Sequence, residues 1–374
     1  MSERASEQLT QGDPAPPADL DHEPAAPRRL TRRGWTIVVS FAIAAVLGLL
    51  GGLVRVPYVS IGPGPTYDTL GTVDEQVVVE VEGEKTYETS GQLRMTTVSI
   101  SDDVSLFGAL GLWVSGRHAL MPRDEYFGPG QTEDDLQREN KKMFQDSQSD
   151  AEVAALRYLD YPVKVVAQEI TRGAPADEVL EPGDRLYEVN GRPVEVQEDV
   201  REALKNTRPG QRVEITFQHE DQPRQTRSIE LGNASDYGSD DRKEGFLGLL
   251  PIDRADVDFQ TTIHLEDVGG PSAGLIFALA IVDKLTPGEL EGGRTVAGTG
   301  EIDVKGNIGL IGGISFKLVA ARDAGAEAFL VPAGNCAEAK SNVPDGLALV
   351  KVDTLDSAVK ALEDLEAGRT PPIC

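Results

Sequence analysis

Residues 269–285 read GGPSAGLIFALAIVDKL. The two glycines allow backbone conformations with positive φ, and Pro271 suits the first position of a helix. The apolar run over residues 273–285 predicts a helix, which should end at residues 286–288, Thr-Pro-Gly. Ser272 then lies at the helix start, where unpaired backbone N–H groups can stabilise an oxyanion. A plain cap at a helix entry is the alternative interpretation of this serine.

A second stretch, residues 298–332, reads GTGEIDVKGNIGLIGGISFKLVAARDAGAEAFLVP. Two glycines again precede a predicted helix, with Ser315 as its N-cap and Gly325 as its stop. Lys317 falls in the first turn, where the helix dipole and apolar neighbours both disfavour an ammonium group. We therefore expect a pKa lowered toward neutrality, which suits a general base. Taken alone, Lys317 is more simply interpreted as an exposed surface lysine.

Together the two stretches resemble the proteolytic domain of Lon-type peptidases, which use a Ser–Lys dyad. GPSAG matches the nucleophile motif of that family, and TGEI followed by GxIGGxxxK matches its lysine motif. The resemblance implies that Ser272 is the nucleophile and Lys317 the base. It also implies that Thr299 orients the lysine and that Gly270 and Pro271 support the serine.

This resemblance extends over about residues 245–365 and has one departure. The family has an acidic residue just before GPSAG, whereas this chain has Gly269. Asp267 or Glu266 is expected to substitute for it. The dyad itself does not depend on this position.

Residues 162–232 predict a separate compact unit. VKVVAQEI and RVEITFQ read as strands, and VREALKN between them reads as a helix. With the turns GAPA, PGD and NG, this order resembles the permuted PDZ domain of secreted bacterial proteases. PDZ domains bind extended peptide ends by strand addition. We expect the peptide-binding loop at Leu159, Asp160 and Tyr161, although Asp160 replaces a glycine and its charge opposes a carboxylate. A PDZ domain that serves only as a spacer is the alternative.

Trp35–Val54 reads WTIVVSFAIAAVLGLLGGLV, twenty residues without a charge. That length spans a bilayer as a helix. Four arginines lie within residues 28–33, and only Arg55 follows closely, so the positive-inside rule predicts a cytoplasmic N-terminus. The alternatives are a cleaved signal peptide and a buried helix of a soluble protein.

The segment between this span and the PDZ-like unit is less regular. Residues 76–100 alternate in polarity and predict strands, which loosely resemble the early hairpin of the Lon-type domain. A Lon-like domain split by the PDZ unit is therefore one interpretation. Residues 124–150 are strongly polar and predict a loop or an exposed helix. Ser149 and Glu152 form a capping-box pattern, which predicts a helix start.

Composition excludes several classes of function. The 62 acidic and 36 basic residues give a net charge of −26, which repels nucleic acid. The chain has no CxxC, HExxH or GK[ST] motif, so neither a zinc site nor an ATPase loop is expected. Its two cysteines exclude a disulfide framework and leave a single Cys336–Cys374 bond open. We expect no metal and no cofactor.

The chain thus predicts an α+β protein with a single N-terminal transmembrane helix, a PDZ domain and a Lon-type proteolytic domain. This layout, which lacks an ATPase, resembles the YlbL group of bacterial proteins. The expected parts are a disordered cytoplasmic tail (1–33), a transmembrane helix (34–56), an extracytoplasmic α/β region (57–157), a PDZ domain (158–234), a Lon-type domain (243–366) and a tail (367–374).

The functional hypothesis is a serine endopeptidase anchored in the cell membrane by a single pass. The PDZ and peptidase domains are expected outside the cytoplasm, and the PDZ domain is expected to recognise a substrate or a peptide end. The expected partners are protein or peptide substrates, the membrane and, by analogy with Lon rings, further copies of the chain. The alternative is a non-catalytic PDZ-based binding or scaffold protein on a Lon-like fold.

Overall fold

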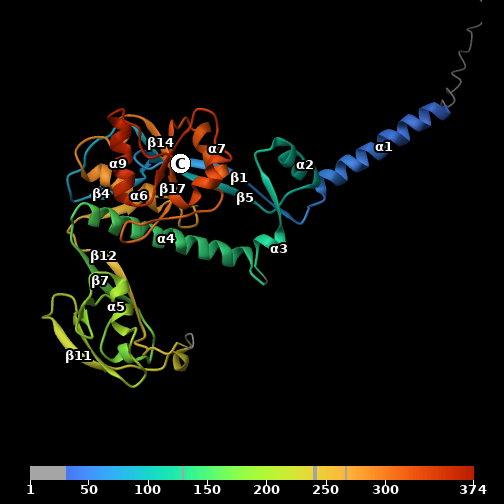
Figure 1. The fold of residues 1–374 in the computed structure, drawn as a ribbon. Helices are drawn as coiled ribbons and strands as arrows, with labels where there is room; N and C mark the ends of the chain where they lie inside the picture. Colours follow the sequence, from blue (N-terminus) through green and yellow to red (C-terminus); the bar gives the residue numbers. More distant parts are fainter. Residues whose placement is uncertain (1–30, 129, 239–241, 266–267) are drawn as a thin grey trace, which may run out of the picture. The chain divides into compact units, whose positions relative to one another are not determined.

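A computed structural model describes residues 31–128, 130–238, 242–265 and 268–374 (Figure 1). Most of the tail expected at residues 1–33 lies outside these ranges, as do Glu266 and Asp267. The chain divides into two units that meet between Val54 and Arg55.

The first unit contains the helix α1 (Arg32–Leu53), whose N-cap Thr31 accepts a hydrogen bond from the Gly34 N–H. Within the described residues, α1 is the one helix that is long and apolar enough to cross a membrane. Both ends of α1 lie a few residues earlier in the chain than those of the transmembrane helix predicted at residues 34–56.

The second unit is built on a mixed six-stranded sheet with the order β18-β17-β14-β5-β1-β6. In chain order these strands are β1 (Tyr58–Asp68), β5 (Gln92–Ser101), β6 (Ala119–Pro122), β14 (Thr295–Gly298), β17 (Ala328–Pro332) and β18 (Ala348–Val352). β5 and β14 pair in parallel, although they precede and follow the PDZ segment. The sheet therefore takes its strands from both sides of that insertion.

Helices cover both faces of this sheet, because successive side chains of a strand point to opposite sides. On β17, Ala328 and Leu330 pack in one core with α6 (Gly274–Leu285), while Phe329 and Val331 pack in another with α7 (Ile314–Asp323). Every α6 side chain except Lys284 is buried, as its uninterrupted apolar run requires. The helix α9 (Leu355–Glu366) contacts α6 as well.

The long helix α4 (Glu133–Tyr158) also packs on α6, with Phe144 against Phe277 in an edge-to-face contact. Its capping box lies at Thr132 and Asp135. The helix start predicted at Ser149 is wrong, because Ser149 lies inside α4. Its hydroxyl instead accepts a hydrogen bond from the Arg254 guanidinium.

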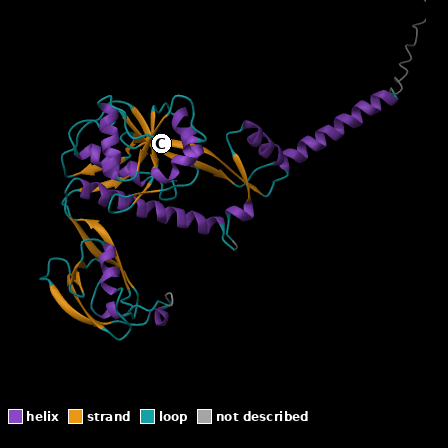
Figure 2. Cartoon of the chain, viewed as in Figure 1, coloured by secondary structure: helices purple, strands orange, loops and turns teal. Residues whose placement is uncertain are grey.

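The PDZ unit is a second sheet with the order β11-β10-β8-β7-β12, in which β9 pairs with β8. Figure 2 draws its strands in orange, with a helix in purple next to them. Its elements are β7 (Val163–Ile170), β8 (Arg185–Val189), β9 (Arg192–Pro193), α5 (Gln197–Leu204), β10 (Arg212–Gln218), β11 (Gln225–Glu230) and β12 (Leu249–Ala255). The strand β12 pairs with β7, so this sheet extends beyond the boundary expected at residue 234. Residues 249–255 thus belong to the PDZ sheet rather than to the Lon-type part.

Shorter elements complete the unit. The strand pairs are β2 (Thr72–Val73) with β3 (Gln76–Val77), β4 (Val79–Glu82) with β13 (Gln260–Ile263), and β15 (Glu301–Ile302) with β16 (Ile308–Gly309). The short helices are α2 (Leu106–Ser115), α3 (Arg123–Tyr126) and α8 (Cys336–Lys340), with 3₁₀ turns at 175–178, 234–237 and 333–335.

The last residues are not a free tail. The Lys351 N–H on β18 donates to the Pro372 carbonyl, and Ile373 forms a β-bridge with Val350. Cys374 forms a disulfide with Cys336 on α8. The single bond that the cysteine count left open is therefore formed, and it fixes the C-terminus to the α7 side of the sheet.

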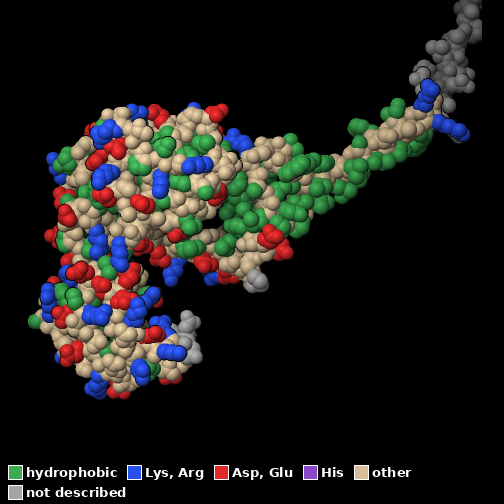
Figure 3. Space-filling view, in the orientation of Figure 1, with side chains coloured by type: hydrophobic (Ala, Val, Ile, Leu, Met, Phe, Trp, Pro, Cys, Tyr) green, Lys and Arg blue, Asp and Glu red, His purple; other side chains and the backbone are tan. Residues whose placement is uncertain are grey.

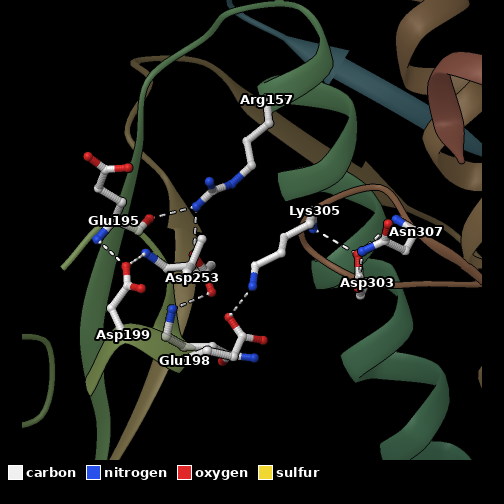
Figure 4. A network of polar contacts seen from close by, with 10 residues as sticks. Arg157, Glu195, Glu198, Asp199, Asp253, Asp303, Lys305 and Asn307 are labelled. Atoms are coloured by element: carbon white, nitrogen blue, oxygen red, sulfur yellow. Dashed lines mark hydrogen bonds and ion pairs between the residues drawn. The ribbon is translucent and has the colours of Figure 1, made fainter. Parts of the chain in front are cut away.

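A network of polar contacts joins the two parts of the second unit (Figure 4). At the end of α4, Arg157 makes a 2.7 Å ion pair with Asp253 of β12, whose side chain is fully buried. Asp253 also accepts a hydrogen bond from the Gln197 N–H at the start of α5. Next to it, Lys305 in the β15–β16 turn lies 3.5 Å from Glu198 of α5.

Candidate active site

Ser272 meets the buried Lys317 and Thr299 in one cluster, in which the serine itself is only partly buried. The Lys317 Nζ lies 2.6 Å from the Ser272 Oγ and 2.8 Å from the Thr299 Oγ1. The threonine hydroxyl in turn donates to the Ser272 carbonyl over 3.0 Å. The structure thus brings together three side chains that are 45 residues apart at most in the sequence.

Ser272 occupies a tight turn just before α6. Gly270 has φ 85°, a conformation that favours glycine, and α6 begins only at Gly274 with Ala273 as its N-cap. Pro271 is therefore not the first helical residue as predicted. Among the described residues, the amides of Ser272 and Ala273 donate to no acceptor, which leaves both available to an oxyanion.

Lys317 lies in the first turn of α7 and is only 2% exposed. Burial lowers the pKa of its ammonium group to about 8, against a weaker raising effect of the Glu301 carboxylate. The N-cap of α7 is Gly313 with φ 71°, not Ser315 as predicted. Ser315 instead points its hydroxyl toward the Glu338 carboxylate of α8.

The Ser272 carbonyl is held from two directions. It accepts hydrogen bonds from the Thr299 hydroxyl and from the Gly300 N–H, which is 2.9 Å away. The Leu275 N–H donates back to the Gly300 carbonyl. The end of β14 and the start of α6 are thus joined by three hydrogen bonds, which fix the serine turn.

The helix α4 supports the same turn, and sequence reasoning missed it. The Ser147 hydroxyl donates to the Pro271 carbonyl over 2.8 Å, and the Asn140 carbonyl accepts from the Gly270 N–H. Ser147 shares the buried face of α4 with Phe144 and Ala151, at i−3 and i+4. This spacing was the signal in the sequence that could have placed Ser147 on a buried helix face. It can be recognised only if residues 133–158 are taken as one helix.

The same contact explains the departure at Gly269. A Cβ at this position would lie 2.9 Å from the Asn140 Cβ of α4, which is closer than side-chain atoms normally approach. An acidic side chain therefore does not fit here without a shift of α4. The residues expected to replace it, Glu266 and Asp267, lie outside the described residues.

The PDZ unit has its own groove, a cavity of about 780 Å³ between α5 and the start of β12. Val200 and Leu204 line one side, and the segment Phe246–Leu249 lines the other. Gly248 in this segment has φ 78°, and a Cβ there would lie 2.2 Å from the Ala174 Cβ. The β12 strand is at the end of its sheet, next to the groove.

The three residues expected to bind a peptide do not line this groove. Leu159, Asp160 and Tyr161 follow α4, and both apolar side chains pack against the core around α6 rather than line the groove. The structure therefore differs from the expectation, because α4 is long enough to carry these residues into the proteolytic part. The apolar–Gly–apolar signal in fact occurs as FLGL at residues 246–249, before the last PDZ strand.

Comparisons with known proteins find the same two kinds of domain, although the PDZ match includes α4 and ends before β12. Residues 261–363 match the Lon protease (S16) C-terminal proteolytic domain, and residues 133–231 match the PDZ domain. The Lon proteases of Rickettsia felis and Rickettsia conorii are each 36% identical over 110 residues, covering 28% of this chain and 14% of theirs. That of Clostridioides difficile is 31% identical over 143 residues, covering 34% of this chain and 18% of its own.

One similar solved structure is the PDZ domain of an SdrC-like protein from Listeria monocytogenes. It has 20% identity and a TM-score of 0.21, and it covers 24% of this chain and 87% of that one. The two family models together indicate a proteolytic domain of the serine peptidase class in the same chain as a PDZ domain. The chain therefore carries a Lon-type proteolytic domain, and the matched part spans only 14–18% of the length of the Lon proteases named above.

Proposed function

We propose that this protein is a membrane-anchored serine endopeptidase that uses Ser272 as nucleophile and Lys317 as general base. The observation that carries the proposal is the 2.6 Å contact between the Nζ of the buried Lys317 and the Oγ of the partly buried Ser272. A lysine that is 2% exposed is costly to keep charged, and its lowered pKa supplies a neutral amine near physiological pH.

The hydrogen bonds of Thr299 and Lys317 indicate where the hydroxyl and amine protons lie in the proposed mechanism. A neutral amine has two N–H groups and one lone pair, and Thr299 accepts one N–H because its own hydroxyl proton goes to the Ser272 carbonyl. The lone pair can then accept the Ser272 proton as the Oγ attacks the substrate carbonyl carbon. The free amides of Ser272 and Ala273 stabilise the resulting oxyanion.

Collapse of this tetrahedral intermediate breaks the peptide C–N bond. Lys317 passes its extra proton to the leaving amine and becomes neutral again. It then takes a proton from water, whose oxygen attacks the acyl carbon, and the proton returns to the Ser272 Oγ as the ester bond breaks. The sum is hydrolysis of one peptide bond, and no metal or nucleotide takes part in any step.

The PDZ groove supports recognition of an extended peptide end. A peptide can add as a strand along the free edge of β12, with an apolar side chain between Val200 and Leu204. Arg242 lines the end of the groove near Phe246 and offers a positive charge to a terminal carboxylate.

Membrane anchoring is supported by the length and composition of α1 and by the arginines before it. The disulfide between Cys336 and Cys374 supports a location outside the cytoplasm, since disulfides persist in oxidising compartments. Both observations favour a single pass with the catalytic unit on the outer side.

A serine-reactive fluorophosphonate probe tests the catalytic proposal on the full chain in detergent or bilayers. We expect covalent labelling of the wild type, none of Ser272→Ala, and almost none of Lys317→Arg, because arginine keeps its proton. Labelling that persists in Ser272→Ala would remove this serine as nucleophile. A folded wild type that is neither labelled nor active on casein would favour the scaffold alternative.

A further inference from the structure

One face of the helix α2 in the second unit is apolar and exposed. Five of its side chains are 49–72% exposed. They are Leu106, Phe107, Leu110, Trp113 and Val114. Their spacing i, i+1, i+4, i+7, i+8 places them on one side of the helix. Figure 3 shows hydrophobic side chains gathered over this helix.

This face is part of an ordered element and not the side of a frayed segment. The Ser105 side chain caps the helix by accepting from the Gly108 N–H, and Gly116 ends it in a left-handed conformation. Ala109, at the border of this face, is buried. Thirteen consecutive residues, Val104–Gly116, carry no charge. Exposure of apolar surface to water costs roughly 25 cal/mol per Å², so association with a partner that covers this face is favoured.

The backbone around α2 joins it to the start of the second unit. The Val56 N–H donates to the Val104 carbonyl over 2.9 Å, and Arg55 forms a β-bridge with Ser105. Arg55 also makes a 2.6 Å ion pair with Asp103. Arg55 and Val56, which contact the start of α2, thus lie only two and three residues after Leu53, where α1 ends. The chain between them is at most about 10 Å long when extended.

We infer that the exposed face of α2 lies in the lipid headgroup region of the membrane that α1 crosses. The inference rests on the proposed anchoring, because the short connection then keeps α2 at the level of the bilayer surface. An uncharged helix with an apolar face buries that face readily at such an interface. Trp113 is suited to this depth, since indole combines an apolar ring with a polar N–H.

The two tryptophans of the chain allow a direct test, because one lies in each helix. Trp35→Phe leaves Trp113 as the only tryptophan in the full-length protein, which is then reconstituted into phosphatidylcholine bilayers. We expect lipids brominated near the headgroup end of the acyl chain to quench Trp113 fluorescence, and aqueous iodide to quench it weakly. Leu110→Glu in the same background should reduce the lipid quenching without loss of peptidase turnover.

The matched control is Trp113→Phe, which leaves Trp35 as the reporter of α1. If brominated lipids fail to quench Trp35, membrane anchoring itself is refuted. If Trp35 is quenched but Trp113 responds only to iodide, the face is in water and the inference fails while anchoring stands. If neither quencher reaches Trp113, protein covers the face, for example a second copy, and the lipid inference is likewise overturned.

Discussion

At the scale of single residues, the burial of Lys317 is the feature that sets the chemistry. An ammonium group in this position has little contact with water, and its hydrogen-bond partners among the described residues are the Ser272 and Thr299 hydroxyls. Burial therefore lowers the pKa of Lys317 to about 8, which raises the neutral fraction of the amine at any given pH. Burial costs stability and, in the proposed mechanism, supplies the general base. The burial of Lys317 leads to one prediction for the rate of peptide hydrolysis and one for the free energy of unfolding.

Peptidase turnover should rise with pH through the pKa of Lys317, about 8, and level off above it, because only the neutral amine accepts the serine proton. Thr299→Val keeps the volume and removes the hydroxyl that orients the amine. We expect a lower kcat with little change in KM, and the measurement is a pH–rate profile of both proteins on one fluorogenic peptide. A flat wild-type rate between about pH 6 and 10 would exclude Lys317 as the titrating base.

Lys317→Met should abolish turnover and stabilise the fold. The folded pKa of about 8 lies below the ordinary value of 10.5, so the charged form is penalised by up to about 3 kcal/mol below pH 8. The penalty disappears as pH rises from 8 to 10.5, because the folded protein is then already neutral. Urea unfolding at pH 7 and pH 10.5 should show a gain for the variant at pH 7 only. An equal gain at both pH values would contradict the burial argument.

At the scale of elements, α4 holds the turn that carries Ser272 through backbone and side-chain contacts. Ser147 and Asn140 hold the carbonyl of Pro271 and the N–H of Gly270 from one helix. Neither residue touches the reacting atoms, so both act as positioning residues. The helix therefore packs against the Ser272 turn and α6 even though its end leads into the PDZ sheet.

Ser147→Ala should lower kcat by up to about tenfold and leave KM nearly unchanged, since one hydrogen bond of about 1 kcal/mol no longer fixes the turn. Ser149→Ala is the matched control, because that hydroxyl contacts Arg254 and not the turn. Steady-state kinetics of both variants, with urea unfolding to compare their stabilities, separates the two effects. Equal loss of kcat in both variants would show that α4 acts only through overall stability.

The elements also show what the sequence can and cannot predict. The Ser272 and Lys317 segments were readable because motif, glycine turn and helix start are all local. The C-terminal boundary of the PDZ sheet could not be predicted in this way, because β12 joins that sheet only by pairing with β7, about 80 residues earlier. The groove segment 246–249 was missed for the same reason. Gly313 displaced Ser315 as helix cap because the preceding left-handed backbone turn needs glycine.

At the scale of the whole molecule, the Cys336–Cys374 disulfide closes a loop with a sequence separation of 38 residues. The chain-entropy model assigns such a loop about 4 kcal/mol of stability. We therefore expect dithiothreitol to lower the urea midpoint of the wild type. The Cys336→Ala/Cys374→Ala double variant should start at that lower midpoint and not respond to the reductant. A reductant-insensitive wild type would mean that the bond does not contribute.

The interleaved sheet has a consequence for how the protein is made. Thr96 on β5 donates to the Gly298 carbonyl on β14, 202 residues later in the chain. The PDZ sheet needs only residues 163–255 and can form while synthesis continues. The proteolytic sheet must wait until β14, β17 and β18 have been delivered. No growing chain can therefore bring Ser272 and Lys317 together before the later strands are made, so the proposed dyad forms only in the nearly complete chain.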